Sequence, residues 1–355
     1  MGRKVGILTG GGDCPGLNGV IRGVVEVCAT KDIQVFGFHA GWRGALEGEG
    51  HYLTLDEVDG IQTQGGTILE SSRTNLKKIE GGPEQVQKVM KELGLDALVA
   101  IGGDDTLGVA NHLRKEYGVN VVGVPKTIDN DLNSTDFTFG FDTASNIAME
   151  AIDRLHTTAA SHARCFVVEC MGRDSGWITL QAGWAGDANL CIIPEHPMTM
   201  DEIMTLVRKR FNDGKRYSII AIAEGIKVEG LEEDNLQYDA FGHPILADSN
   251  LARNLAKAIE KRMREDETLA EKRKYFECRH MVLGHLQRGG SPSAFDRVLS
   301  SRMGIAAGEM VVNEDYGHMV AIRGTKIVKE DLDYAVTQRK DVDDQFFEAA
   351  QYYFR

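Results

Sequence analysis

Five charged side chains come directly after two short apolar segments of the chain, residues 97–101 and 121–124. They are Asp104, Asp105, Lys126, Asp129 and Asp131. Continuously apolar, Val-rich segments of this kind are typical of buried parallel strands, and ligands of parallel sheets gather at the carboxyl ends of the strands. Four carboxylates in one crevice repel one another unless a metal ion or a polyphosphate balances their charge. The pattern therefore predicts a site of phosphoryl transfer.

A glycine-rich segment, Thr9–Gly16, follows the strand-like residues 5–8 and precedes the amphipathic residues 17–28. Glycine lets backbone amides close around an anion, and a helix that follows points the positive end of its dipole at the same place. Glycine-rich turns between a strand and a helix also serve packing alone, so this segment by itself leaves both interpretations open. It has neither the Gly-Lys-Ser/Thr of a Walker A loop nor the GxGxxG pattern of dinucleotide binding.

The composition is that of an ordinary globular chain that is long enough for two domains. Of its 355 residues, 42% are hydrophobic and 26% are charged. The formal net charge is −13, so no basic field extends over the sequence, and we expect neither nucleic acid nor a membrane as a partner. We find no leader pattern and no apolar run near the roughly 18 residues of a membrane-spanning helix. The expected location is the cytoplasm.

Six cysteines and ten histidines are scattered along the chain without the spacing of a metal site. Neither a CxxC pair nor an HExxH pair is present, so we expect no zinc site and no disulfide framework. The cysteines are expected to be small buried thiols.

Strand-like segments alternate with amphipathic segments along most of the chain. The predicted strands are residues 5–8, 33–38, 97–101, 119–124, 165–169, 190–193, 218–223 and 281–283. The predicted helices are residues 17–28, 83–93, 106–117, 143–159, 200–211 and 251–264. The repeated order of strand, helix and strand predicts an α/β fold whose parallel-rich sheets carry helices on both faces.

Two regions depart from this alternation. Residues 226–250 are acidic and poor in large aliphatic side chains, and the charge-dense residues 261–274 follow them, which predicts a surface loop without a catalytic role and a solvated helix. The acidic side chains of the first region are Glu229, Glu232, Glu233, Asp234 and Asp239. The last thirty or so residues predict a helical tail whose aromatic side chains pack on the body or on a neighbouring subunit.

Six motifs of the chain resemble those of the phosphofructokinase family in order and spacing. They are Gly10–Gly16, Gly65–Thr67, Gly102–Asp104, Thr127–Asp131, Met171–Arg173 and Gly284–Pro292. The resemblance covers residues 4–322 apart from the acidic insertion. It implies two Rossmann-like α/β domains of three layers, with an active site in the cleft between them. It also implies transfer of a phosphoryl group to the 1-hydroxyl of fructose 6-phosphate with Mg²⁺.

The resemblance also implies how the chain is divided. Residues 1–140 plus about 289–335 are expected to bind the phosphoryl donor and the metal. Residues 141–288 plus about 336–355 are expected to bind fructose 6-phosphate.

Three of the matched residues carry the expected chemistry. Asp129 corresponds to the family's general base, which accepts the proton of the attacking hydroxyl, while Thr127 and Asp131 orient the site. Asp104 corresponds to the metal-binding carboxylate, and a hard oxygen ligand suits Mg²⁺. Arg173 corresponds to the residue that neutralises charge on the transferred phosphoryl group.

The resemblance assigns a second set of residues to fructose 6-phosphate. Besides Thr127, Asp129 and Arg173, the set is Arg164, Met171, Gly172, Glu224, Arg279, His285 and Arg288. Arginine suits phosphate because its guanidinium makes bidentate contacts and stays charged, and Glu224 would accept hydrogen bonds from the sugar. In the family the counterparts of Arg164 and Arg279 reach in from a neighbouring subunit, which implies a homodimer or homotetramer. Taken singly, a residue of these types is more often structural than functional, so the assignment depends on the joint pattern.

Two departures from the ATP-using pattern predict the phosphoryl donor. ATP-dependent relatives usually carry glycine where Asp105 stands, and many carry glycine where Lys126 stands. At about 4 Å, two like charges repel by on the order of 1 kcal/mol in water and by several at a partly shielded surface, so Asp105 opposes a nucleotide. The Lys126 ammonium can contact the terminal phosphate of pyrophosphate, although some ATP-using members share this lysine. The pair resembles the pyrophosphate-dependent branch of the family.

Lys126 is also expected to act in catalysis beside Asp129, Arg173 and Thr127. The remaining residues expected to contact the donor are Gly11, Gly12, Arg73 and Thr106. The expected reaction gives fructose 1,6-bisphosphate and phosphate, is reversible, and serves glycolysis and gluconeogenesis.

Regulation is expected to be weak. Where allosteric bacterial relatives place basic residues for an effector phosphate, this chain has Glu26 and His156, although Arg22 and Lys215 match. A carboxylate in an anion pocket opposes binding, so ADP and phosphoenolpyruvate should hardly affect the activity.

Three alternatives remain open from the sequence. An ATP-dependent phosphofructokinase would require the nucleotide to bypass Asp105. A catalytically silent, sugar-phosphate-binding regulatory subunit would have no need of Asp104, Asp129 and Arg173. A kinase of nucleotide cofactors would have no reason to carry the 284–292 motif. The sequence does not distinguish a dimer from a tetramer.

Overall fold

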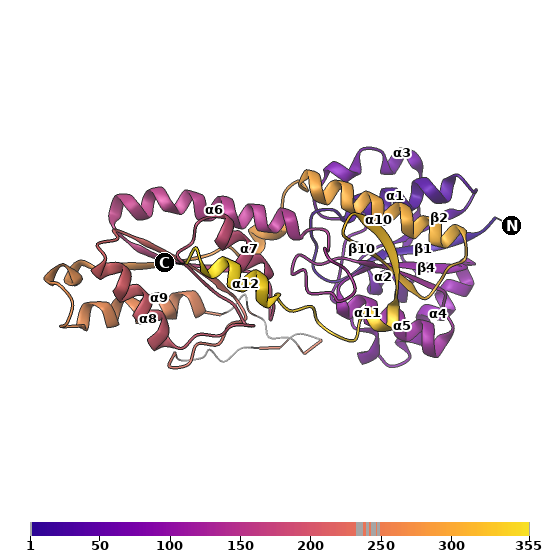
Figure 1. Ribbon diagram of the computed structural model, residues 1–355. Helices are drawn as coiled ribbons and strands as arrows, with labels where there is room; N and C mark the ends of the chain where they lie inside the picture. Colours follow the sequence, from indigo (N-terminus) through magenta and orange to yellow (C-terminus); the bar gives the residue numbers. More distant parts are fainter. Residues whose placement is uncertain (1, 232–236, 239–240, 243–245, 247–248, 355) are drawn as a thin grey trace. The chain divides into compact units, whose positions relative to one another are not determined.

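A computed structural model describes residues 2–231, 237–238, 241–242, 246 and 249–354 (Figure 1). Glu232, Glu233, Asp234 and Asp239 of the acidic insertion lie outside the described residues. The chain divides into two compact units. Unit 1 comprises Met1–Thr143, Ala240–Gly242 and Arg288–Lys340, and unit 2 comprises Ala144–Asp239, His243–Gln287 and Asp341–Arg355. Each unit has its own sheet.

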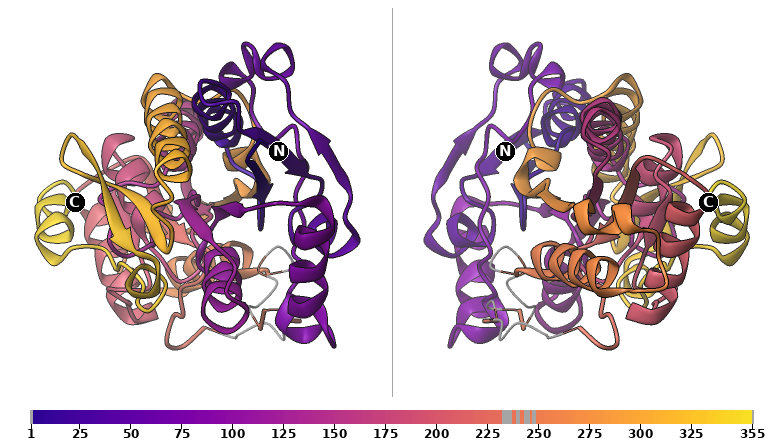
Figure 2. Two further views of the ribbon diagram at one scale, coloured as in Figure 1. Left: turned by 90° about the vertical axis from the view of Figure 1, so that its right-hand side faces the viewer. Right: turned by 90° about the vertical axis from the view of Figure 1, so that its left-hand side faces the viewer.

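Unit 1 is built on a seven-stranded sheet of order β11-β10-β5-β4-β1-β2-β3. Its strands are β1 (Lys4–Thr9), β2 (Gln34–Phe38), β3 (Gly50–Tyr52), β4 (Ala97–Gly102), β5 (Val121–Pro125), β10 (His318–Arg323) and β11 (Lys326–Asp331). Its helices are α1 (Leu17–Ala29), α2 (Trp42–Glu47), α3 (Leu55–Val58), α4 (Gly82–Leu93), α5 (Asp104–Tyr117), α10 (Ala294–Val312) and α11 (Leu332–Ala335), with short 3₁₀ helices at Ile61–Thr63 and Leu76–Lys78. Helices α1 and α10 cover one face of the sheet, and α2, α4, α5 and α11 cover the other (Figures 1 and 2).

The centre of this sheet is parallel and buried, as the sequence predicts. Strands β1 and β4 pair from Val5↔Ala97 to Thr9↔Ile101, and every residue of β4 is buried. Strand β5 pairs with β4 up to Gly102↔Pro125. The two apolar segments that precede the charged side chains are therefore neighbouring strands that end at the same edge.

Both outer strands of this sheet are antiparallel, which the sequence did not predict. Strand β3 pairs antiparallel with β2, and β11 pairs antiparallel with β10 through a two-residue turn that contains Gly324 at φ 57°. A two-residue connection can join only antiparallel strands. Strand β11 lacks the apolar pattern of a buried strand because none of its residues is fully buried.

Unit 2 contains a four-stranded parallel sheet of order β7-β8-β6-β9. Its strands are β6 (Cys165–Cys170), β7 (Leu190–Ile192), β8 (Ser218–Ala223) and β9 (Cys278–Val282). Its helices are α7 (Trp177–Ala185), α8 (Met200–Asn212), α9 (Leu251–Glu265) and α12 (Asp344–Gln351), with 3₁₀ helices η4 (Glu271–Tyr275) and η5 (Gly284–Arg288), of which the last residue, Arg288, belongs to unit 1. Helix α6 (Phe141–His162) begins in unit 1 and continues in unit 2. Helices α8 and α9 supply one hydrophobic core with this sheet.

Two predicted elements of unit 2 differ from the structure. The prediction of a helix over residues 261–274 is wrong after Glu265. Helix α9 ends there, and Asp266 has an extended backbone. The strand expected at 281–283 begins earlier, at Cys278. It is the outer strand of the sheet and four of its five residues are exposed, so its polar first half lacks the apolar signal of a buried strand.

The aromatic tail packs on unit 2, as the sequence predicts. Phe346 of α12 lies with its ring centroid 5.3 Å from Trp184 and 5.8 Å from Trp177. The ring of Phe347 stacks on His196 at 3.8 Å. All six cysteines are buried free thiols. Over the residues that the structure describes, no helix combines the length and the apolarity that crossing a bilayer requires.

Candidate active site

The glycine-rich loop after β1 is held in place by backbone contacts on both sides. The amide of Gly10 donates to the carbonyl oxygen of Ile101 at 2.9 Å, which ties the loop to the end of β4. The amide of Gly11 donates to the carbonyl of Ser72 at 3.1 Å, and the Ser71 hydroxyl donates to the carbonyl of Gly11 at 2.5 Å. Residues 71–72 thus fix the loop, and Arg73, which is expected to contact the phosphoryl donor, directly follows them in sequence.

Three polar side chains converge on this loop from other elements of unit 1. A Cβ atom added at Gly12 would lie 2.4 Å from Nη1 of Arg288. One added at Gly11 would lie 3.3 Å from Nζ of Lys126 and 3.8 Å from Oγ1 of Thr106. Gly11 also has φ 81°, which other residues rarely adopt. Because Gly11 and Gly12 have no side chains, an ammonium, a guanidinium and a hydroxyl can lie against their backbone. Groups of this kind around exposed backbone amides can bind a phosphate.

The local electrostatics agree with an anion site. Lys126 is 5% exposed, so its charge is poorly screened by water. Burial raises the pKa of the Cys14 thiol, and the positive charges of Lys126 and Arg288 lower it, whereas Asp296 and Asp13 raise it. Lys126 is the strongest charge acting on this part of the segment, and Arg288 adds to it, while the two carboxylates oppose both.

Asp104 and Asp105 form the first turn of α5, at the carboxyl end of β4. Asp104 is exposed, Asp105 is half-buried, and Thr106 beside them is buried. Carboxylates in a first turn also stabilise a helix through its dipole, so their position has a structural benefit independent of any ligand.

The residues present fit a magnesium ion that binds together with a phosphate. Within the described parts of the chain, no three His, Cys, Asp or Glu side chains are grouped closely enough to hold a metal by themselves. Magnesium commonly takes only one or two protein carboxylates and completes its shell with phosphate oxygens and water. The exposed Asp104, two residues from Thr106, could supply one such carboxylate.

The segment after β5 is a rigid loop that presents Asp129. The amide of Asp129 donates to Oγ1 of Thr127 at 3.0 Å. Asn130 is buried with φ 53°, and its Oδ1 accepts from the amide of Thr138 at 3.0 Å. The Thr138 hydroxyl donates to the carbonyl of Thr127 at 2.7 Å. These bonds fix the backbone on both sides of Asp129, while the half-buried Asp129 stays accessible.

In unit 2, the loop after β6 is shaped by Glu224 at the end of β8. Oε1 of Glu224 accepts from the amides of Gly172 at 3.3 Å and Arg173 at 3.1 Å. Arg173 has φ 51° and Gly172 has φ 144°, both unusual for residues with side chains. A Cβ at Gly225 would lie 1.9 Å from the carbonyl oxygen of Arg173, so the loop packs directly on this glycine. Glu224 therefore has a structural role in positioning Arg173.

Arg164 and Arg279 lie together at the β9 edge of the same unit. Nε of Arg164 contacts Oε2 of Glu277, and Nη2 of Arg279 is 3.2 Å from the same oxygen. The hydrogen bond from Arg164 lowers the pKa of Glu277, and the positive charges of both arginines add to this. Arg279 also lies 3.8 Å from Oε2 of Glu260, so the two guanidinium groups are balanced by two carboxylates at this edge. These five-donor groups can still offer bidentate contacts to a phosphate.

The structure thus gathers the predicted residues in distinct places. Gly11, Gly12, Thr106, Lys126 and Arg288 meet in unit 1, where Asp104, Asp105, Thr127 and Asp129 follow the neighbouring strands. Met171, Gly172, Arg173 and Glu224 meet in unit 2, and Arg164 lies with Arg279. His285 is an exposed residue of η5. Arg288, which the resemblance assigns to the sugar phosphate, contacts the glycine-rich loop.

Several residues that support these loops were not predicted. Buried Gln287 accepts from the amide of Met171 at 3.3 Å through Oε1, and Asn130 and Lys340 support the Asp129 loop. Gln287 lies within the Gly284–Pro292 motif, and this was the only signal in the sequence that could have indicated its role. Lys340 is 210 residues from Asn130, and no local pattern indicates that they meet.

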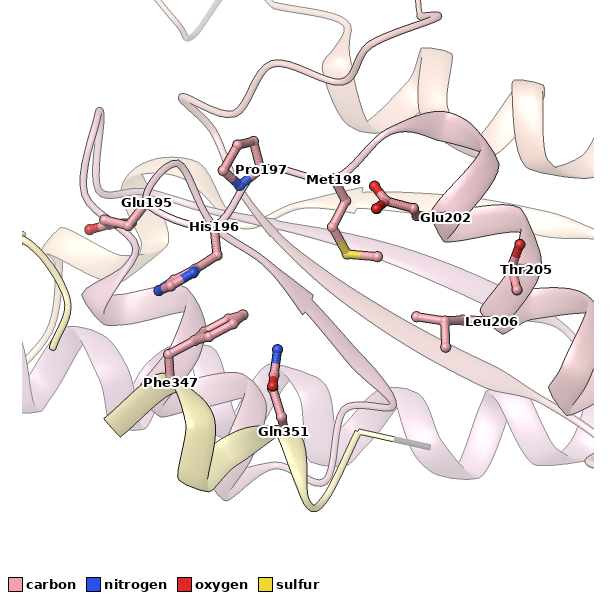
Figure 3. A pocket seen from close by; sticks show the side chains of 9 residues that line it. All are labelled: Glu195, His196, Pro197, Met198, Glu202, Thr205, Leu206, Phe347 and Gln351. Carbon is pink, nitrogen blue, oxygen red and sulfur yellow. The ribbon is translucent and has the colours of Figure 1, made fainter. Parts of the chain in front are cut away.

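A pocket of about 590 Å³ lies elsewhere in unit 2, between α8, α12 and residues 195–198 (Figure 3). Its lining residues are Glu195, His196, Pro197, Met198, Glu202, Thr205, Leu206, Phe347 and Gln351. Figure 3 shows the stacked rings of His196 and Phe347 at one side and the apolar side chains of Met198 and Leu206 at the other. None of the predicted site residues lines it.

The chain resembles known proteins along nearly its whole length. A family model described as phosphofructokinase matches residues 4–311. Two proteins named pyrophosphate–fructose 6-phosphate 1-phosphotransferase, from Amycolatopsis mediterranei and Amycolatopsis methanolica, are 49% and 50% identical to it over 99% of each chain. "ATP-dependent 6-phosphofructokinase 3" of Streptomyces coelicolor is 45% identical over 98% of this chain and 99% of the relative.

The fold also matches a solved structure. Phosphofructokinase of Pichia pastoris in the T-state has a TM-score of 0.81 and 29% identity. The match covers 100% of this chain and 37% of that one.

Proposed function

The chain belongs to the phosphofructokinase family, and we propose that it transfers a phosphoryl group from pyrophosphate to the 1-hydroxyl of D-fructose 6-phosphate. The products are fructose 1,6-bisphosphate and phosphate, and the reaction is reversible. The relatives named for the pyrophosphate reaction are 49% and 50% identical, and the relative named for ATP is 45% identical. This difference is small and does not by itself distinguish the two donors.

The donor assignment depends on two charged residues that follow neighbouring strands. They are Asp105 and the buried Lys126. Lys126 lies against Gly11, where it can hold a compact, highly charged diphosphate. Asp105, on the first turn of α5, adds a negative charge that a nucleotide would have to pass. A bare diphosphate has no α-phosphate and no ribose that must pass this carboxylate, so it meets neither this repulsion nor the steric block. An ATP-dependent enzyme is the alternative.

The chain's own residues supply the steps of the reaction. Asp129 accepts the proton of the 1-hydroxyl while that oxygen forms a bond to the phosphorus and the bridging P–O bond of pyrophosphate breaks. Lys126 and Arg288 hold the donor, and Arg173 neutralises the charge of the transferred group. Asp104 would hold a magnesium ion together with pyrophosphate, and the ion would supply positive charge that offsets the charge of the phosphate groups.

We further assign the two substrates to the two units. Unit 1 binds pyrophosphate at the glycine-rich loop, and unit 2 binds the sugar phosphate through Arg173, Glu224 and His285. The β9 edge carries Arg164 and Arg279, which reach into the active site of a second copy of the chain, so the active form is a homodimer or homotetramer. Effector control by ADP or phosphoenolpyruvate is absent or weak.

The donor assay tests the proposed function directly. Purified protein with fructose 6-phosphate and Mg²⁺ is expected to form fructose 1,6-bisphosphate with pyrophosphate and to be at least about tenfold less efficient with ATP, because about 1.4 kcal/mol of repulsion suffices for that factor. Product is measured by coupled oxidation of NADH. Omitting Mg²⁺ should abolish turnover, and ADP or phosphoenolpyruvate should leave the saturation curves hyperbolic. Strong turnover with ATP alone refutes the donor assignment, and no turnover with either donor supports a silent regulatory subunit.

Replacing Asp105 with glycine is expected to raise kcat/KM for ATP about tenfold or more. The change removes the charge and the side chain that oppose the nucleotide, and the gain should appear mainly in KM for ATP. Steady-state kinetics with both donors measure it.

The control for this change is Asp56→Gly, since Asp56 is an exposed first-turn carboxylate of α3 in the same unit. It reproduces the cost of a glycine in a helix without touching the donor loop. If Asp105→Gly improves ATP use no more than Asp56→Gly does, the charge argument is wrong.

A further inference from the structure

Lys340, the last residue of unit 1, reaches the loop that carries Asp129. The residue is half-buried, and its Nζ donates to Oδ1 of Asn130 at 3.0 Å and to the carbonyls of Thr135 at 3.0 Å and Asp136 at 2.9 Å. Its backbone amide donates to the carbonyl of Asp131 at 2.8 Å. Four hydrogen bonds from one residue therefore attach the end of the unit to this loop.

The neighbouring residue extends the contact. Arg339 forms an isolated antiparallel bridge with Leu132. The C-terminal segment of unit 1 thus lies along the loop as a short strand would, and the loop is braced from outside as well as by its own Thr127 and Thr138.

Asn130 is the residue on which these contacts converge. It adjoins Asp129, is 1% exposed, and has φ 53°. Asparagine tolerates this left-handed conformation better than most residues, but the conformation still has to be stabilised by its surroundings. Its Oδ1 receives the Lys340 ammonium and the Thr138 amide, and these two donors fix the side chain and hence the backbone next to Asp129.

The charge state of Lys340 matters for this arrangement. Burial lowers its pKa to about 8, the carboxylates of Asp131 and Asp136 oppose that shift, and Arg323 adds to it. An ammonium has three N–H donors for the three acceptors, whereas a neutral amine has two. Loss of the proton above this pKa therefore removes one of these hydrogen bonds and loosens the loop.

We propose that Lys340 is a positioning residue for the phosphoryl-transfer reaction, which holds the Asn130 side chain and thereby sets the orientation of Asp129. This inference rests on the proposed role of Asp129 as the general base. Lys340 does not touch substrate, so its effect should appear in turnover rather than in binding.

The test compares Lys340→Met with Lys340→Arg and with the control Lys326→Met in the full chain. Lys326 is an exposed lysine of the same unit. Lys340→Met is expected to lower kcat about 100-fold, since a misplacement near 1 Å costs this much, while KM for both substrates stays within about twofold. Lys340→Arg should recover part of the rate, and Lys326→Met should match the wild type.

Two further measurements separate positioning from stability. The kcat of the wild type should decline above about pH 8 in step with the Lys340 charge, and this decline should be missing in Lys340→Met. Hydrogen exchange should speed up at the amides of Asp129 and Thr138 in Lys340→Met and remain unchanged elsewhere in unit 1. The exchange measurement needs no turnover, so it also applies to a variant of low activity.

The outcomes distinguish this inference from the proposed function. Wild-type kcat in Lys340→Met, or unchanged exchange at Asp129 and Thr138, overturns the role of Lys340 and leaves the proposed function standing. A wild type that uses only ATP overturns the donor, and the Lys340 comparison is then decided with ATP. A wild type inactive with both donors contradicts both.

Discussion

Replacing Asp129 with asparagine is expected to lower kcat about 10²–10⁴-fold, the range that a general acid–base residue contributes. The amide is almost the same size as the carboxylate, but it cannot take the proton of the sugar hydroxyl. The amide-to-hydroxyl bond between Asp129 and Thr127 uses the backbone, so the substitution leaves it in place. KM for both substrates should therefore change little, and steady-state kinetics with pyrophosphate measure both parameters.

Asp56→Asn is the matched control for Asp129→Asn, because it makes the same chemical change at an exposed position of unit 1. It should have wild-type kinetics. A loss of less than about tenfold in kcat for Asp129→Asn contradicts the role as general base. If Asp129→Asn instead raises KM by a factor as large as the expected loss in kcat, the residue mainly binds substrate.

The part of the site nearest the strand ends could be predicted because it depends on local sequence. The two apolar segments are neighbouring parallel strands, so residues that directly follow them must share an edge of the sheet. Asp104 and Lys126 are placed in this way, and the side chains of the sheet's interior identify the strands. The same logic found only the second half of β9, because four of its five residues are exposed, and it missed β11, none of whose residues is fully buried. It also missed β10, although four of its residues are buried.

The supporting residues could not be predicted, because a hydrogen bond from a side chain to a distant backbone leaves no spacing in the sequence. Ser71 and Ser72 fix Gly11, and Lys340 fixes Asn130, across 60 residues or more. Arg288 gives a related lesson. Its long side chain carries five donors, so the residue type fits either a sugar phosphate or a donor phosphate, and only the fold places it against Gly12.

Replacing Arg173 with methionine is expected to lower kcat by about 10³-fold or more, the effect of removing an arginine that stabilises the transition state of phosphoryl transfer. The backbone amide of Arg173 donates to Glu224, and its carbonyl packs on Gly225. These contacts from outside the loop make the loop rigid. A preorganised guanidinium needs no reorganisation as charge develops, which is why its loss should affect turnover more than binding.

Lysine at the same position should recover only part of the rate, because an ammonium keeps the charge but lacks the planar fork that matches two phosphoryl oxygens. The control is Arg154→Met, which removes an exposed arginine paired with Glu150 on α6. Its kinetics should match the wild type. If Arg173→Met keeps kcat and raises only KM for fructose 6-phosphate, Arg173 binds the sugar phosphate in the ground state, and charge stabilisation falls to Lys126 and Arg288 of unit 1.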